Sequence, residues 1–252
     1  MKIKAVGLSE KGNFRKENQD FLNYYKNSDG SFLAIICDGM GGHKHGEIAS
    51  RLAVDTLVDL FKKTSFDKKE SKEIFSWLEK SVSYIINVMK KYVEDFIEAK
   101  DMGTTLSAIL IANNNAHIIN IGDSRIYHLK DQSLNQIAID QNLMNSNYDI
   151  QKIRQQAQRY YGTKFNENTY WKSLTSALGP AKKLKIDNYF LKNSNGLFCL
   201  TTDGIHDFID SKTFKDYLDL KSSLKTKAKN IIKYSINNLS TDNLSIILLE
   251  VL

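Results

Sequence analysis

The sequence predicts an α+β protein with a central sandwich of two mostly antiparallel β-sheets, flanked by pairs of helices in α-β-β-α layers. Short β-rich runs come in blocks that amphipathic helical segments separate. A parallel sheet would need regular alternation of strands and helices, so the sheets are expected to be mostly antiparallel. The chain has 252 residues, a single proline and no Gly/Ser/Pro-rich linker, which predicts one domain over residues 1–252.

The strands are predicted from apolar runs of four to eight residues, each flanked by turn residues. A final run, 244–251, is the most apolar of them. The expected strands are 3–8, 21–25, 32–37, 104–111, 116–121, 125–129, 134–139, 184–191, 197–201 and 244–251.

The helices are predicted from apolar residues that recur every three to four positions. This spacing is clear in 47–61 and in 72–99, where one apolar stripe per helix indicates core packing. One or two further helices are expected over 211–238. Residues 140–173 are polar and weakly periodic, so we expect a flap-like excursion there with a short helix near 149–160.

Composition narrows the class of protein. No stretch approaches the roughly 20 consecutive apolar residues of a membrane span, and the first residues lack the apolar core of a signal peptide. We therefore expect a cytoplasmic protein with no membrane association. Cys37 and Cys199 both lie in apolar runs, which favours buried, unreactive thiols over a redox role.

The net charge of +6 raises the possibility of nucleic-acid binding. Lysines are dispersed along the chain, however, and a dense basic arm with interleaved aromatic residues is missing. We expect solvated helix faces and no nucleic-acid partner. A basic exterior would also attract a phosphorylated, anionic partner.

Acidic residues mark the ends of the predicted strands. Asp-Gly and Asp-Asn pairs are common turn dipeptides, and for one such pair a turn is the simpler interpretation. If several of these strand ends converge, the carboxylates repel one another unless cations lie between them. Mg²⁺ and Mn²⁺ prefer oxygen ligands, and zinc-type Cys/His spacing is missing. The five aspartates at strand boundaries are Asp20, Asp38, Asp123, Asp203 and Asp242.

Seven motifs follow one another along the chain: Arg15-Lys-Glu-Asn-Gln-Asp20, Asp38-Gly-Met-Gly-Gly42 with Gly46-Glu-Ile-Ala-Ser50, Met102-Gly-Thr-Thr105, Gly122-Asp-Ser-Arg125, Leu174-Thr-Ser-Ala-Leu-Gly179, Thr202-Asp-Gly-Ile-His-Asp207 and Asp242-Asn243. In this order they resemble the type 2C protein phosphatases, the metal-dependent PPM family, in its small bacterial single-domain form. The resemblance implies hydrolysis of phosphoserine and phosphothreonine in phosphorylated proteins by direct attack of a metal-activated water.

The resemblance also implies roles for individual residues. Asp38 corresponds to the carboxylate that bridges two core ions, Mn²⁺ or Mg²⁺, and the Gly39 carbonyl to a ligand of the first. Asp203 and Asp242 correspond to ligands of the second ion, and Asp20 supports the first. Asp123 and Asp207 correspond to ligands of a more weakly held third ion. Arg15 corresponds to the guanidinium that binds the substrate phosphate.

Some positions depart from the family pattern. Met40 stands near a histidine that is proposed as general acid in other members, so the leaving group is protonated by His43, His45, His206 or a metal-held water. Asp140-Gln-Asn replaces the usual Asp-His-Ser, at the start of the flap. In the family this flap influences substrate choice.

Two alternatives stay open at this point. A small-molecule phosphomonoesterase could use the same metal core, and a catalytically inactive binding module could keep the same fold. We expect a monomer whose partners are phosphorylated proteins, together with the opposing serine/threonine kinase.

Overall fold

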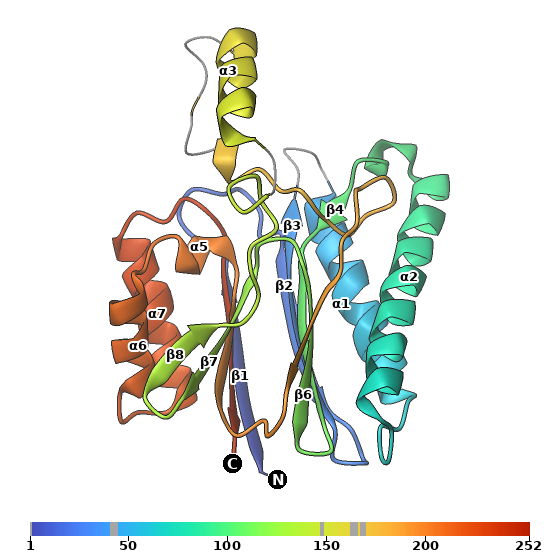
Figure 1. The fold of residues 1–252 in the computed structure, drawn as a ribbon, viewed down its shortest axis with the longest axis vertical. Helices are drawn as coiled ribbons and strands as arrows, with labels where there is room; N and C mark the ends of the chain where they lie inside the picture. Colours follow the sequence, from blue (N-terminus) through green and yellow to red (C-terminus); the bar gives the residue numbers. More distant parts are fainter. Residues whose placement is uncertain (1, 41–44, 147–148, 162–165, 167–169) are drawn as a thin grey trace.

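Two β-sheets lie face to face in the computed structural model, which describes residues 2–40, 45–146, 149–161, 166 and 170–252 (Figure 1). The strands are β1 Ile3–Glu10, β2 Asp20–Lys26, β3 Phe32–Met40, β4 Gly103–Thr104, β5 Leu106–Ala112, β6 Asn115–Ile121, β7 Arg125–Lys130, β8 Ser133–Gln136, β9 Asp187–Leu191, β10 Gly196–Thr201 and β11 Leu244–Val251. One sheet has the order β1-β11-β10-β7-β8. The other has the order β2-β3-β5-β6-β9, with β4 paired to β3. All of these pairs are antiparallel, as predicted.

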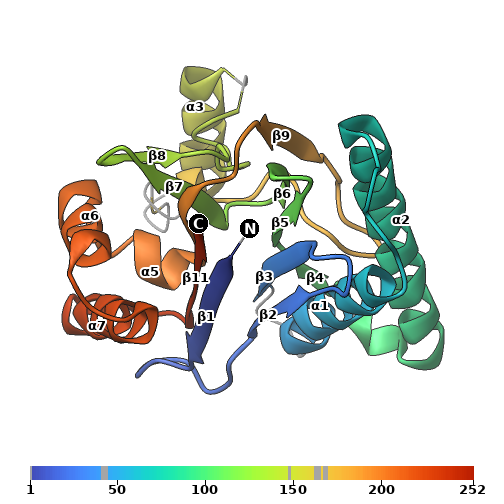
Figure 2. The ribbon, with the colours of Figure 1, turned by 90° about the horizontal axis from the view of Figure 1, so that it is seen from below.

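Helices cover the outer face of each sheet (Figure 2). Helices α1 (Gly46–Lys62) and α2 (Ser71–Asp95) lie on the β3 sheet, while α6 (Ser211–Asp219) and α7 (Leu224–Asn237) lie on the β11 sheet. The helix starts follow capping rules: Asp210 accepts hydrogen bonds from Lys212 N and Thr213 N, and Ser223 accepts one from Thr226 N. The predicted α-β-β-α layers are confirmed.

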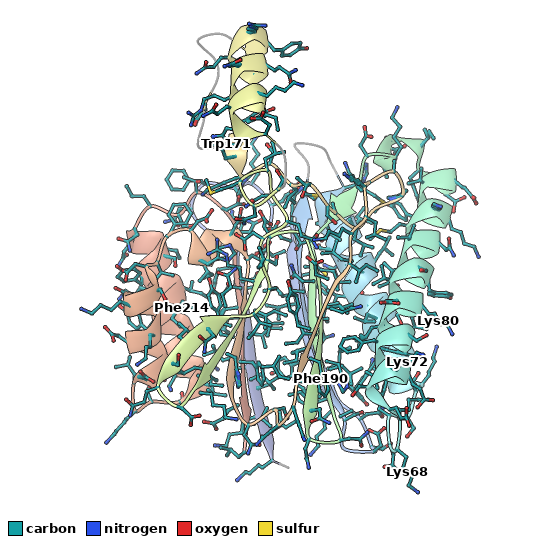
Figure 3. All side chains as sticks on the ribbon, viewed as in Figure 1. Lys68, Lys72, Lys80, Trp171, Phe190 and Phe214 are labelled. Atoms are coloured by element: carbon teal, nitrogen blue, oxygen red, sulfur yellow. The ribbon has the colours of Figure 1, made fainter. Side chains whose placement is uncertain are left out.

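Apolar side chains fill three layers between these elements. Ile109, Ile118 and Leu249 are among those between the two sheets. Phe214 of α6 is 2% exposed and packs against the β11 sheet (Figure 3). Removing this apolar area from water is the main term that stabilises the fold.

Both cysteines belong to these layers. Cys37 and Cys199 are 0% exposed, and burial raises the pKa of each thiol well above its ordinary value. The prediction of buried, unreactive thiols is confirmed, because the thiolate is the reactive form.

Several predicted boundaries are wrong by a few residues. The expected helix over 72–99 ends earlier, since α2 stops at Asp95 and the backbone leaves the helical region at Phe96 before a short 3₁₀ turn, η1 (Ile97–Ala99). The expected strands 134–139 and 184–191 are shorter, as β8 ends at Gln136 and β9 begins at Asp187. Periodicity predicted the elements, while local hydrogen bonding decided their ends.

The excursion at 140–173 extends from one end of the sandwich (Figure 1). Its helix α3 (Ile150–Tyr161) agrees with the helix expected near 149–160. Trp171, 5% exposed, lies below α3 where the excursion rejoins the sandwich (Figure 3). The Met144 N–H donates to the Trp171 carbonyl at 3.0 Å, which holds the two branches of the flap together at its base.

In the part of the chain that the structure describes, no helix combines the length and hydropathy that a membrane crossing requires.

Phe61 offers a test of the core beneath α1. Its ring is 0% exposed and lies 5.2 Å from Phe66 and 6.4 Å from Trp77, measured between ring centroids. Phe61→Ala should lower the free energy of unfolding by about 3–5 kcal/mol, because it leaves a cavity among these rings. Urea unfolding measures the change. Tyr84→Ala on the exposed face of α2 is the control, and an equal loss in both variants would contradict this packing.

Candidate active site

The strand register brings the predicted aspartates to one end of the sandwich. Asp20 at the start of β2 lies directly opposite Asp38 near the end of β3. Neighbouring strands are antiparallel, so the end of one strand lies beside the start of the next. One end of the sandwich therefore holds the ends of β3, β6 and β10 and the starts of β2 and β11. Asp123 and Asp203 follow β6 and β10, and Asp242 precedes β11. All five strand-boundary aspartates therefore meet at the end of the sandwich that bears the flap.

A cavity of about 260 Å³ opens between these strand ends. A second cavity, of about 460 Å³, shares Asp123, Lys172 and Asp203 with it and adds Asp207 and His206. Asp20 lies outside both and lines a third cavity of about 290 Å³. The first cavity is lined by Arg15, Gln19, Asp38, Gly39, Met40, Thr105, Asp123, Lys172, Leu174, Asp203 and Asp242.

Backbone and hydroxyl groups fix the position of Asp38. The Asp38 N–H donates to Thr105 Oγ1 at 2.9 Å, and its carbonyl accepts from Thr104 Oγ1 at 2.8 Å and from the Thr105 N–H at 2.9 Å. Thr105 Oγ1 also shares a hydrogen bond with Ser124 Oγ at 2.7 Å. The threonine motif thus joins β3 to the loop that carries Asp123.

Gly39 allows a close approach of three segments. A Cβ atom at this position would lie 2.2 Å from the Gly46 carbonyl oxygen and 2.5 Å from that of Gln19. Only a residue without a side chain fits here, which explains the glycine that follows Asp38.

Asp20 links the two sheets. Its Oδ2 accepts a hydrogen bond from Thr202 Oγ1 at 2.8 Å, and Thr202 Oγ1 accepts from the Ser245 N–H at 3.1 Å. In the part of the chain that the structure describes, the other oxygen, Oδ1, is buried without a hydrogen-bond partner, and so is Oδ1 of Asp203. Buried carboxylate oxygens without partners are costly, so these atoms are available to a cation.

Burial and mutual repulsion favour the neutral forms of these carboxyls. Burial, together with the charges of Asp20 and Asp203, raises the pKa of Asp38 well above its usual range. Burial followed by the charge of Asp242 does the same to the pKa of Asp203. The pKa of Asp20 and that of Asp123 are each raised to about 7, in both cases mainly by burial. A cluster of this kind is typical of functional sites.

Two basic side chains pair with the edge of the cluster. Arg15 Nη2 donates to Asp242 Oδ2, and this hydrogen bond raises the pKa of the guanidinium. Lys172, at the end of the flap, lies 2.6 Å from Asp207 Oδ2. In the described residues, no group of three or more His, Cys, Asp or Glu side chains is arranged to hold a metal ion as it stands.

The histidines differ in their surroundings. His206 is 7% exposed, its Nδ1 lies 2.9 Å from Thr201 Oγ1, and burial lowers its pKa well below the ordinary value. It is therefore neutral at pH 7, which disfavours it as a proton donor. His45 precedes α1, and its buried Nδ1 has no hydrogen-bond partner among the described residues. His43 lies outside the described residues.

The sequence analysis assigned no role to two residues that support the site. Asn243 accepts a hydrogen bond from the Gln19 N–H and donates to the carbonyls of Lys11 and Glu17, so it holds the loop that carries Arg15. Its place beside Asp242 was the only available signal.

Gln141 is the second of these residues. Its Oε1 accepts from the Gly122 N–H at 2.8 Å, and its Nε2 donates to Asp187 Oδ2 at 2.8 Å. Gln141 thereby ties the start of the flap to β9 and to the turn before Asp123. The departure from Asp-His-Ser at 140–142 was the sequence signal.

The fold and the carboxylate cluster define the class: an α-β-β-α sandwich with an acidic centre at one end. The chain belongs to the protein phosphatase 2C family, whose sequence profile matches residues 15–239. It is 29% identical over 243 residues to the serine/threonine phosphatase stp of Listeria welshimeri, covering 96% of this chain and 93% of the relative.

Solved structures share the fold. The serine/threonine phosphatase Stp1 of Staphylococcus aureus superposes with a TM-score of 0.83 at 24% identity, covering 100% of this chain and 96% of Stp1. The catalytic domain of the serine/threonine protein phosphatase PstP, in complex with 2 manganese ions, superposes with a TM-score of 0.75 at 24% identity. It covers 98% of this chain and 97% of PstP.

Asp20→Asn tests the repulsion in the cluster. A carboxyl whose pKa is raised in the folded protein keeps a proton that the unfolded chain has lost, so its contribution to stability falls as pH rises. In EDTA the variant should exceed the wild type in Tm, by a margin that grows from about pH 4 to about pH 7. Thermal melts from pH 5 to pH 8 measure this margin. The same margin at pH 5 and at pH 8 would contradict the assignment.

Proposed function

We propose that this chain is a metal-dependent protein serine/threonine phosphatase, which hydrolyses phosphoserine and phosphothreonine with a water molecule as the nucleophile. Four strand-boundary aspartates, Asp38, Asp123, Asp203 and Asp242, line one cavity, and Asp20 lies opposite Asp38 on the neighbouring strand. This convergence is the observation that carries the proposal. The family assignment and the names of the relatives support it.

The donor set fits hard divalent cations. It offers carboxylates and one carbonyl, two of the carboxylate oxygens are buried without partners, and the charges repel one another until a cation balances them. A protein of the same fold, PstP, has been described with 2 manganese ions. We assign the two core ions, Mn²⁺ or Mg²⁺, to Asp20, Asp38, the Gly39 carbonyl, Asp203 and Asp242, and a weaker third to Asp123 and Asp207.

Divalent cations lower the pKa of a coordinated water and balance the charge that develops on the phosphoryl oxygens. The protein's own residues then place the substrate. Arg15 presents a planar guanidinium that can pair with two phosphate oxygens at once. Asp242 Oδ2 accepts from this guanidinium in the structure and would also be a ligand for a cation, in which case Arg15 would be available to the phosphate.

The lining of the first cavity agrees with attack by water. Its described residues include neither cysteine nor histidine, two of the side chains that attack phosphoryl groups, and we assign its aspartates to cations. Met40 lines this cavity without a titratable group, so it supplies no proton to the leaving alkoxide.

The same proposal covers the organisation of the chain. Residues 1–252 act as one phosphatase domain, and 140–173 form a flap beside the active site. Phosphorylated proteins are the substrates. That the protein is a monomer, lies in the cytoplasm and acts against a serine/threonine kinase stays a prediction from the sequence.

Hydrolysis of a phosphothreonine peptide tests the function directly. Phosphate release should require Mn²⁺ or Mg²⁺ and should stop in EDTA, because the carboxylates alone cannot activate water. Phosphate release measured by malachite green gives the rate, and Asp38→Asn is the near-isosteric control that should be inactive. Turnover of an aryl phosphate without turnover of the peptide would identify a different phosphomonoesterase.

Arg15→Ala separates substrate binding from chemistry. The variant should raise KM for the peptide about tenfold or more, since a charge-assisted hydrogen bond to phosphate is lost. Arg15→Lys should recover only part of the loss, because an ammonium cannot pair with two oxygens at fixed spacing. Steady-state kinetics provides both values, and an unchanged KM in Arg15→Ala would remove Arg15 from the phosphate site.

A further inference from the structure

A lysine-rich loop lies between the flap and β9. Residues 180–186, which we call the lysine loop, carry Lys182, Lys183 and Lys185, and no acidic residue occurs between 173 and 186. The loop is held in place by backbone contacts, since the Ala177 N–H donates to the Lys183 carbonyl at 2.9 Å and the Lys185 N–H donates to Ser176 Oγ at 2.8 Å. The preceding Leu178 pairs with Thr104 of β4, which places the loop at the end of the sandwich that holds the carboxylates.

A groove connects this loop to the active site. A cavity of about 650 Å³ is lined by Lys183 and Lys185 together with residues at the base of the flap. It shares four of its residues, Ile139, Asp140, Asn142 and Asn145, with the 460 Å³ cavity that contains Asp123, Asp203 and Asp207. A chain bound at the carboxylates can therefore continue past Ile139 toward the lysine loop.

Lys182 lies on the other side of the loop, nearer the catalytic cavity. A Cβ atom built on Gly103 would lie 2.9 Å from Lys182 Cε and 3.4 Å from Met40 Sδ. Met40 itself lines the catalytic cavity. The three lysines thus extend from the rim of the catalytic cavity into the groove.

The acidic residues of the groove are bound to other protein groups. Asp140 accepts hydrogen bonds from Arg125 Nε at 2.8 Å, from Arg125 Nη2 at 2.6 Å and from Gln136 Nε2 at 3.0 Å. Asp187 accepts from Gln141 Nε2 at 2.8 Å and pairs with Lys185 at 3.0 Å. The Lys185 side chain is nevertheless 66% exposed, against 21% for Asp187. The Lys185 ammonium is therefore more accessible to a bound chain than the carboxylate with which it pairs.

The rest of the lining suits an extended polypeptide. The amides of Asn145 and Asn188 each donate one proton within the protein, to the Asp140 carbonyl and to Glu79, and each has a second proton that can pair with a peptide carbonyl. The exposed lysines of this loop would attract a nearby anionic chain.

We propose that the groove and the lysine loop bind the substrate polypeptide next to the phosphorylated residue, and that they favour substrates with acidic residues there. This inference rests on the proposed phosphatase function and specifies its substrate class. Charge complementarity of this kind acts through encounter and orientation of the substrate.

Three phosphothreonine peptides test the inference. They share one length and carry glutamate, alanine or lysine in the three positions on each side of the phosphothreonine. The wild type should show a kcat/KM about tenfold higher for the glutamate peptide than for the alanine peptide, and lowest for the lysine peptide. The preference should shrink at high ionic strength, because salt screens exposed charges.

Two triple variants test whether the lysine loop causes the preference for the glutamate peptide. Lys182→Ala, Lys183→Ala and Lys185→Ala together should bring the glutamate-to-alanine ratio close to one. Lys225→Ala, Lys229→Ala and Lys233→Ala on the exposed face of α7 remove the same charge from the opposite layer and should leave the ratio unchanged (Figure 2). Thermal melts of both variants verify folding.

The outcomes separate the two proposals. Equal kcat/KM for the three peptides in the wild type, or an equal loss of preference in both triple variants, would overturn the inference while the phosphatase function stands. Failure of the wild type to hydrolyse any of the peptides would overturn the phosphatase function itself.

Discussion

Repulsion among carboxylates at one end of the sandwich is the constraint on which the rest of the structure depends. The β2–β3 register sets Asp20 against Asp38, and the neighbouring strand ends add Asp123, Asp203 and Asp242. Such an arrangement opposes folding, so it must be offset elsewhere. Three apolar layers and a set of uncharged donors, among them Thr104 and Thr202, supply that stability.

The active site therefore combines a rigid base with a peripheral substrate region. Strand ends and the residues next to them hold the aspartates, while the base of the flap and the lysine loop line the neighbouring cavities. Asp140 and Gln141, at the start of the flap, connect the two parts. Asp140 accepts a hydrogen bond from Arg125, and Gln141 accepts one from the Gly122 N–H. If the proposed substrate groove is correct, this division keeps the hydrolytic centre fixed while substrate preference is set at its rim.

Local patterns predicted the elements well and their limits less well. Periodicity alone extended the second long helix to Ala99, since Phe96 fits an apolar stripe, yet the structure leaves Phe96 45% exposed beyond the end of α2. The short helix α5 (Asp203–His206) was not predicted, because Asp-Gly is a turn signal and four residues carry no period. Its backbone is held by Thr202, whose carbonyl accepts from the Ile205 N–H.

The sequence by itself determined the fold class, the order of the elements and the motifs that place the chain in the protein phosphatase 2C family, because these depend on hydropathy and on residue identity along the chain. Only the tertiary structure decided which groups meet. The pairing of Arg125 with Asp140, the tether from Gln141 to Asp187 and the continuity of the groove join residues from different strands and loops. Such contacts depend on strand register and on packing between layers, which no local pattern encodes.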